Sequence, residues 1–267
     1  MYQSKKIAFL FLWCGLFSFS QGKFVLQGAN KDKISFKLIN NLIIIPVEIN
    51  GVELSFLLDT GVSKPIIFNF LNITEELQIN QAEKIYLRGL GEGESVEALR
   101  SRNNIFKIGK ALSISQSLYA VFDPELNFAP RLGVPIHGII GYDFFKDFIV
   151  EVNYASRYIR LYDPETYKAK SCSSCEVFDL EFFNNKPYIT GSVEIGDEEL
   201  PVTLLIDSGG SDALWLFDDE ERGIHIPDKY FDDFLGRGLS GSVYGKRAKI
   251  NSFSLGKFKL RHVNVAF

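Results

Sequence analysis

The chain has 267 residues, of which 46% are hydrophobic, 14% aromatic and 23% charged, a composition typical of a globular protein with a buried core. Its net charge of -4, without a run of Lys or Arg, argues against a nucleic-acid partner. The length allows one large domain or two small ones, and the short apolar runs rich in Phe, Ile, Val and Tyr predict mostly strands.

The first twenty residues predict a secretory signal peptide. Two lysines precede an apolar run from Ile7 to Phe19, and the small residues Ser18 and Ser20 suit a cleavage site before Gln21. The run is shorter than the about 20 residues that span a bilayer. We therefore expect residues 1–20 to be removed and the mature chain to be exported (periplasmic, cell-surface or extracellular) without stable membrane insertion. The alternative is an N-terminal strand or anchor.

The first part of the chain contains a predicted β-hairpin whose second strand leads into an aspartate. Asn50-Gly51 lies between alternating apolar residues and predicts a hairpin turn, and the outgoing strand leads into Asp59-Thr60-Gly61. Further on, Gly89 to Gly93 reads GLGEG. The stretch HGIIGYDFFKDF, residues 137–148, predicts a turn into a short helix, and residues 149–164 predict a further hairpin.

A pair of cysteines follows in the sequence KSCSSCEV. In an exported protein, Cys172 and Cys175 predict a local disulfide within a connecting segment, residues 166–185. No histidine lies nearby, so the pair is a poor zinc site, and we expect no metal site.

The first pattern then repeats. Gly196-Asp197 takes the turn position, and Asp207-Ser208-Gly209 lies 148 positions after the first acidic motif. Gly238 to Ser242 reads GLSGS; Leu90 lies 31 positions after Asp59, and Leu239 lies 32 after Asp207. A duplication of this length predicts an all-β chain of two lobes with short helices, residues 21–165 and residues 186–267.

The duplicated acids suggest a chemistry. A carboxylate at the end of an apolar strand is unfavourable unless the site uses it. Two carboxylates within hydrogen-bonding distance share a proton, so that one activates a water as base and the other protonates a carbonyl oxygen as acid. Gly61 and Gly209 allow the backbone to turn tightly beside the acids.

The paired Asp-Thr-Gly and Asp-Ser-Gly motifs resemble those of pepsin-like and retropepsin-like aspartic proteases. HGIIG resembles the hydrophobic-hydrophobic-Gly element that threads beside the Asp loop in that fold, and GLGEG and GLSGS fall where retropepsins carry flaps. The nearest likeness is to bacterial secreted retropepsin-like proteases, which often carry a PDZ domain after the protease. The resemblance covers about residues 35–267.

The resemblance implies a bilobal acid-protease fold and an aspartic endopeptidase that needs no cofactor. Asp59 and Asp207 would be the catalytic dyad of a pseudo-dimeric monomer acting on peptide or protein substrates, and Thr60 and Ser208 would hydrogen-bond across the two loops. The flap residues expected to close over the substrate are Gly89, Leu90, Gly91, Gly238, Leu239 and Ser240.

The second copy stops at Phe267, which matches Phe122 of the first, and nothing corresponds to HGIIG a second time. We expect the second lobe to be incomplete, its strand before Asp207 to expose an apolar edge, and Asp207 to be held less firmly than Asp59. We also expect the natural gene product to continue with another such turn, a helix and a PDZ-like domain.

Two other functions compete with the protease. A peptide-binding module on the same scaffold that has lost turnover would not need to retain both acids. A carbohydrate-binding or structural β-protein explains the strands but leaves the duplicated motif without a reason.

Overall fold

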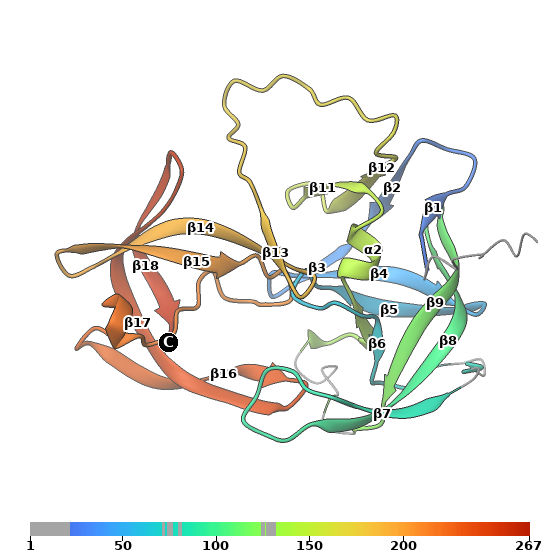
Figure 1. The fold of residues 1–267 in the computed structure, drawn as a ribbon, viewed down its shortest axis with the longest axis horizontal. Helices are drawn as coiled ribbons and strands as arrows, with labels where there is room; N and C mark the ends of the chain where they lie inside the picture. The colour runs from blue at the N-terminus through green and yellow to red at the C-terminus, as the bar shows by residue number, and fades with distance from the viewer. Residues whose placement is uncertain (1–21, 71–72, 74–76, 80–81, 124–125, 127–131) are drawn as a thin grey trace, which may run out of the picture.

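The computed structural model describes residues 22–70, 73, 77–79, 82–123, 126 and 132–267. Within them the chain is almost entirely β-structure, as predicted, with two lobes side by side in Figure 1, the blue-to-green first lobe and the orange-to-red second lobe. The predicted signal peptide, residues 1–20, lies outside the described residues. No helix in the described part has the length and apolar character needed to cross a membrane.

The first lobe is built on a nine-stranded sheet with the order β1-β9-β6-β10-β5-β4-β8-β7 and β3 added beside β4. Its strands are β1 (Val25–Leu26), β3 (Lys37–Ile39), β4 (Leu42–Ile49), β5 (Val52–Leu58), β6 (Ile66–Ile67), β7 (Glu83–Leu87), β8 (Val96–Ile108), β9 (Ala111–Val121) and β10 (Gly138–Ile140). The short helix α2 (Tyr142–Phe145) follows β10 directly, where the sequence predicts it.

A three-stranded sheet of β2 (Lys31–Ser35), β12 (Tyr158–Tyr162) and β11 (Ile149–Asn153) covers the first lobe. The apolar residues of these strands alternate with polar ones, so that Ile34, Ile159 and Leu161 face inward. They join the main hydrophobic core, in which Phe56, Phe106 and other large side chains are fully buried.

The second lobe is a six-stranded sheet with the order β13-β14-β17-β16, in which β15 pairs with β14 and β18 with β17. Its strands are β13 (Glu181–Phe183), β14 (Lys186–Ile195), β15 (Glu198–Leu205), β16 (Tyr230–Gly238), β17 (Gly241–Leu255) and β18 (Phe258–Ala266), and a 3-10 turn, η2 (Glu220–Arg222), lies between β15 and β16. Its core is smaller and centres on Val193, Ile195 and Ile250.

The connection between the lobes contains no strand or helix from residue 163 to residue 180. Cys172 and Cys175 form a disulfide within it. The backbone amide of Lys257 donates to Glu176, and the Lys257 ammonium donates to the Cys175 carbonyl, which fastens the connection to the turn between β17 and β18.

The strand that carries each acid is held differently in the two lobes. β5 lies between β4 and β10, and β10 runs parallel to it, with Gly138 opposite Phe56 and Ile140 opposite Leu58. Among the described residues, β15 pairs only with β14. Ile206, which precedes Asp207, is therefore 37% exposed, whereas its counterpart Leu58 is completely buried.

The backbone after β10 approaches the first acidic loop so closely that only glycine fits. A Cβ atom at Gly141 would overlap the Asp59 carbonyl oxygen and would lie 2.5 Å from that of Val62. The amide of Asp59 donates to the Ile140 carbonyl, and the amide of Tyr142 donates to the Val62 carbonyl. These contacts fix the loop that presents the Asp59 side chain.

Gly141→Ala tests this close approach. We expect it to lower the free energy of unfolding by about 2 kcal/mol or more, because the added methyl group must displace backbone. In a chain of this size that lowers Tm by roughly 5 °C. Gly210→Ala is the matched control, since the nearest atom to its added Cβ would lie 3.9 Å away. Equal Tm values for the two variants would contradict this packing.

Candidate active site

Asp59 and Asp207 leave the ends of β5 and β15 in loops of the same shape. In each loop the carboxylate accepts a hydrogen bond from the glycine amide two residues on. The distance is 2.7 Å from Gly61 N to Asp59 Oδ1 and 2.7 Å from Gly209 N to Asp207 Oδ1. Both acids are thus oriented by their own backbone.

Each carboxylate lies against the glycine of the opposite loop. A Cβ atom at Gly61 would be 3.1 Å from Asp207 Oδ2, and a Cβ atom at Gly209 would overlap the Asp59 carboxylate. A side chain at either glycine position would push the two acids apart. Glycine is therefore required at this position of each motif by the close approach of the other lobe, as well as by the tight turn of its own loop.

The two hydroxyl residues exchange hydrogen bonds between the lobes. The Thr60 hydroxyl donates to the Ile206 carbonyl (2.6 Å) and accepts from the Ser208 amide (3.0 Å). In the same way, the Ser208 hydroxyl donates to the Leu58 carbonyl (2.9 Å) and accepts from the Thr60 amide (3.1 Å). Each side chain thus satisfies two backbone groups at the strand end of the other lobe.

A second pair of contacts between the lobes was not found from the sequence. The turns Asn40-Asn41 and Asn184-Asn185 connect β3 to β4 and β13 to β14, with all four residues at positive φ, between 49° and 65°. Asn tolerates this backbone region, which a tight hairpin of this type requires.

Each Asn-Asn turn contacts the loop that follows the acid of the other lobe. The Asn41 amide group donates to the Ser211 carbonyl at 3.1 Å, and the Ser63 hydroxyl donates to the Asn184 carbonyl at 2.9 Å. Ser63 and Ser211 each lie four residues after their acid. The Asn-Asn dipeptide before each repeated hairpin was the available signal.

The fifth residue after each acid anchors its loop through an ion pair. This residue is a cation in the first lobe and an anion in the second. Lys64 binds Asp143 of α2 at 3.2 Å in the first lobe. In the second lobe Asp212 accepts two hydrogen bonds from Arg247 of β17, at 2.9 and 3.1 Å, and one from Trp215 Nε1. These anchors were also missed, because the partners lie far away in the sequence.

The electrostatics of the pair favour a shared proton. The pKa of Asp59 is raised from its ordinary 3.8 to about 7, first by burial and next by the charge of Asp207, with a hydrogen bond to Asp207 adding to the rise. The hydrogen bond from the Gly61 amide and the positive charge of Lys186 act in the opposite direction. Asp59 therefore keeps its proton to near neutral pH while Asp207 lies beside it.

The two glycine-rich segments expected as flaps meet each other. The first is a loop, residues 88–95, between β7 and β8, and the second is the turn Leu239-Ser240 between β16 and β17. They lie together in Figure 1, and Ser240 is their common partner. Its amide donates to the Leu90 carbonyl (3.0 Å), its carbonyl accepts from the Gly93 amide (2.7 Å), and its hydroxyl accepts from the Gly89 amide (3.0 Å).

Close packing explains why these segments are rich in glycine. A Cβ atom at Gly91 or Gly93 would collide with the Ser240 backbone, and one at Gly238 would collide with Leu90. Leu239, like Leu87 and Val96, packs against a buried apolar cluster of the first lobe. The first flap is thus the tip of the β7–β8 hairpin, and its glycines leave room for the Ser240 backbone.

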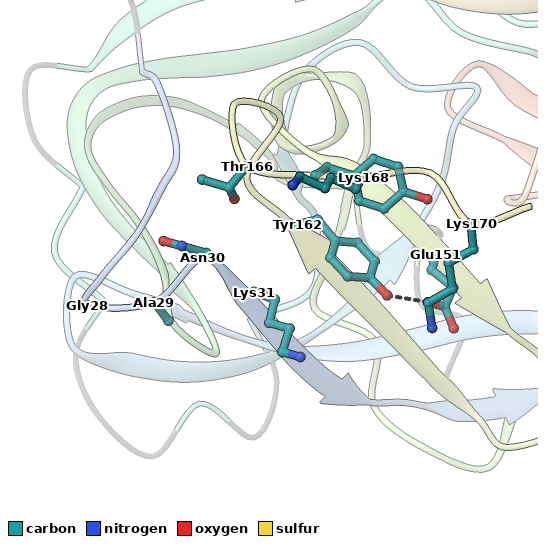
Figure 2. A pocket seen from close by; sticks show the side chains of 10 residues that line it. Gly28, Ala29, Asn30, Lys31, Glu151, Tyr162, Thr166, Lys168 and Lys170 are labelled. Carbon is teal, nitrogen blue, oxygen red and sulfur yellow. Dashed lines mark hydrogen bonds between the residues drawn. The ribbon is translucent and has the colours of Figure 1, made fainter.

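A separate hollow on the first lobe holds none of these residues. Figure 2 shows it beside β2 and β12, with Lys31, Lys168 and Lys170 around it and the Tyr162 hydroxyl donating to Glu151 at 2.7 Å. No group of three His, Cys, Asp or Glu side chains suited to a metal ion occurs in the described residues.

Comparisons with known proteins agree with the motifs. Residues 45–144 match the family model for aspartyl protease, which confirms the resemblance to aspartic proteases over the stretch that contains Asp59, the first flap and β10. No curated protein matches the chain. Among solved structures, it is similar to a retropepsin-like aspartic protease from Rickettsia conorii at 14% identity, over 53% of this chain and 94% of that chain. The TM-score is 0.35, too low to add to the fold described above.

The exchange of hydroxyl groups between the lobes can be measured by a double-mutant cycle. Thr60→Val and Ser208→Ala should each lower the free energy of unfolding by about 1–3 kcal/mol, because each leaves backbone groups without a partner. Because the two residues form one contact, their effects should deviate from additivity by about 0.5 kcal/mol or more. Thr166→Val, which removes an exposed local hydrogen bond, is the control. Its effect on the free energy of unfolding should be additive with that of Ser208→Ala. Strictly additive effects of Thr60→Val and Ser208→Ala would contradict the view that the two hydroxyl groups form one contact.

Asp59→Asn tests the raised pKa through stability. Because the folded state holds the Asp59 proton more tightly than the unfolded chain does, the wild type loses stability as pH rises from about 4 to about 7. The variant cannot ionise at this position, so at pH 8 it should be more stable by up to about 4 kcal/mol, with little difference at pH 3. Urea unfolding of the wild type and the variant between pH 3 and pH 8 measures this difference in free energy. Exposed Asp228→Asn should show no such effect, and a less stable Asp59→Asn at pH 8 would contradict the assignment.

Proposed function

We propose that the chain is an exported aspartic endopeptidase in which Asp59 and Asp207 act as one catalytic dyad. The observation that carries this proposal is the reciprocal geometry of the two loops, in which each carboxylate lies against the glycine of the other. A pair of acids arranged in this way, sharing a proton, suits the activation of a water molecule. The match of residues 45–144 to aspartyl proteases supports the reaction class.

The chemistry needs one proton in the pair. The carboxylate without the proton takes a proton from the attacking water, and the protonated carboxyl group donates to the oxygen of the peptide carbonyl. The amide of Gly61 holds one oxygen of Asp59 and the amide of Gly209 holds one of Asp207, so each acid keeps an oxygen for the reaction. Below about pH 7 the raised pKa of Asp59 keeps this proton in place.

The two flaps enclose the peptide substrate over the dyad. Ser240 joins them, because its amide donates to the Leu90 carbonyl and its oxygens accept from the amides of Gly89 and Gly93. A peptide enters when these bonds open, and the freed backbone groups of the flap then bind the peptide backbone as an added strand. Residues 1–20 direct export, and both acids come from one chain, so the enzyme acts as a pseudo-dimeric monomer.

Activity measurements on a mixed peptide library test the dyad. Asp59→Asn and Asp207→Asn should each lower kcat/KM by at least about 10³-fold, because either change removes one partner of the acid–base pair. Wild-type cleavage should decline as pH rises through about 7, where Asp59 loses its proton. Asp228→Asn, a change of the same type at an exposed position, should retain full activity.

Loss of cleavage must be separated from loss of folding. Circular dichroism and binding of a statine-containing peptide should show both variants folded. Undiminished cleavage by either Asn variant would contradict the mechanism. A folded wild type that binds peptide but cleaves nothing between pH 3 and pH 8 would indicate the peptide-binding module instead.

A further inference from the structure

Lys186 occupies the strand position beside Asp207. In the β14–β15 pair, Tyr188 lies opposite Leu205, and the Ile206 amide donates to the Pro187 carbonyl at 2.9 Å. One step further along the same register, Lys186 faces the position of Asp207. It begins β14 directly after the Asn184-Asn185 turn that contacts the first lobe.

The duplication places a different residue at the equivalent position of the first lobe. Ile44 lies opposite Leu57, two residues before Asp59, as Tyr188 lies opposite Leu205. The residue two positions before Ile44 is Leu42, which also follows an Asn-Asn turn. The two halves of the site thus share a backbone plan, but one carries an ammonium group where the other carries an isobutyl group.

The Lys186 side chain is half-buried, and among the described residues its ammonium group takes part in no ion pair or side-chain hydrogen bond. Two other cations near the acidic loops form ion pairs, Lys64 with Asp143 and Arg247 with Asp212. A half-buried, unpaired cation is unfavourable by itself, so a negative group from outside the chain would find it available.

Lys186 also lies close enough to the dyad for its charge to act there. Burial and the charge of Asp207 raise the pKa of Asp59, and Lys186 opposes this rise. Interactions between charges fall off with distance and screening, so this agrees with the strand register, which puts Lys186 beside the acids.

We propose, on the basis of the protease function above, that Lys186 is a specificity-determining residue that pairs with an acidic side chain of the peptide, Asp or Glu, next to the scissile bond. The pairing occurs on one side of that bond only, because the equivalent position in the other half of the site is Leu42. A charge-assisted hydrogen bond in a partly desolvated cleft selects strongly for a carboxylate over its amide.

Matched peptides measure the preference. For each position flanking the cleaved bond of a library substrate, kcat/KM is compared between peptides carrying Glu and Gln. Wild type should favour Glu at one position by about tenfold, the ratio that one charge-assisted hydrogen bond provides. Lys186→Met should abolish this ratio, which compares two peptides on the same variant and so does not depend on the overall rate of that variant, and Lys186→Glu should favour Lys over Glu at the same position. Lys110→Met, the same change at an exposed turn, should keep the wild-type ratio.

The result separates this inference from the proposed function. Cleavage with equal rates for Glu and Gln at every position, or a preference that survives Lys186→Met, would overturn the role of Lys186 and leave the protease intact. If no peptide is cleaved, the binding of statine-containing peptides with Glu or Gln gives the same comparison without turnover. There, tighter binding of the Glu peptide that is lost in Lys186→Met supports the role, and equal binding overturns it.

Discussion

The contact between the two acidic loops is the constraint on which the rest of the structure depends. Each carboxylate packs against a glycine of the other lobe, and Thr60 and Ser208 exchange hydrogen bonds with the strand ends across the boundary. Neither loop can hold its acid in this position alone, because the surface that receives it belongs to the other lobe. The raised pKa of Asp59 follows from the same contact, which buries the acid and brings Asp207 beside it.

Around this symmetric centre the lobes have become unequal. β5 is enclosed by β4 and β10, whereas β15 has one paired neighbour among the described residues. The loop anchors have opposite charge patterns, with Lys64 in one lobe and Asp212 in the other. The duplicated backbone keeps the two acids together, and the side chains around it can differ. A substrate that lies across both lobes would therefore meet a different chemistry on each side, with Lys186 the clearest difference.

The sequence predicted what local pattern and repetition can determine. Both acids, their glycines, the turns at Asn50 and Gly196, and the helix after HGIIG follow from periodicity and spacing, and the duplication predicted that the acids are related. The sequence did not predict that Asn41 binds the Ser211 carbonyl or that Asp212 binds Arg247, because these partners are 170 and 35 residues away and only the folded chain brings them together. It also did not predict that Lys186 lies beside Asp207, because this depends on strand register. The contact between the two flaps was also missed, since the local pattern does not show that Gly91 and Gly93 leave room for the Ser240 backbone.

The central claim is that Asp207 lies close enough to Asp59 to raise its pKa. Carboxyl ¹³C NMR of protein labelled at aspartate, followed from pH 3 to pH 9 in the wild type and in Asp207→Asn, measures this directly. In the wild type, the Asp59 resonance should titrate near pH 7, and in the variant it should titrate at lower pH because the neighbouring charge is gone, although burial still keeps it above 3.8. An Asp59 resonance that titrates near pH 4 in both proteins would contradict a coupled dyad.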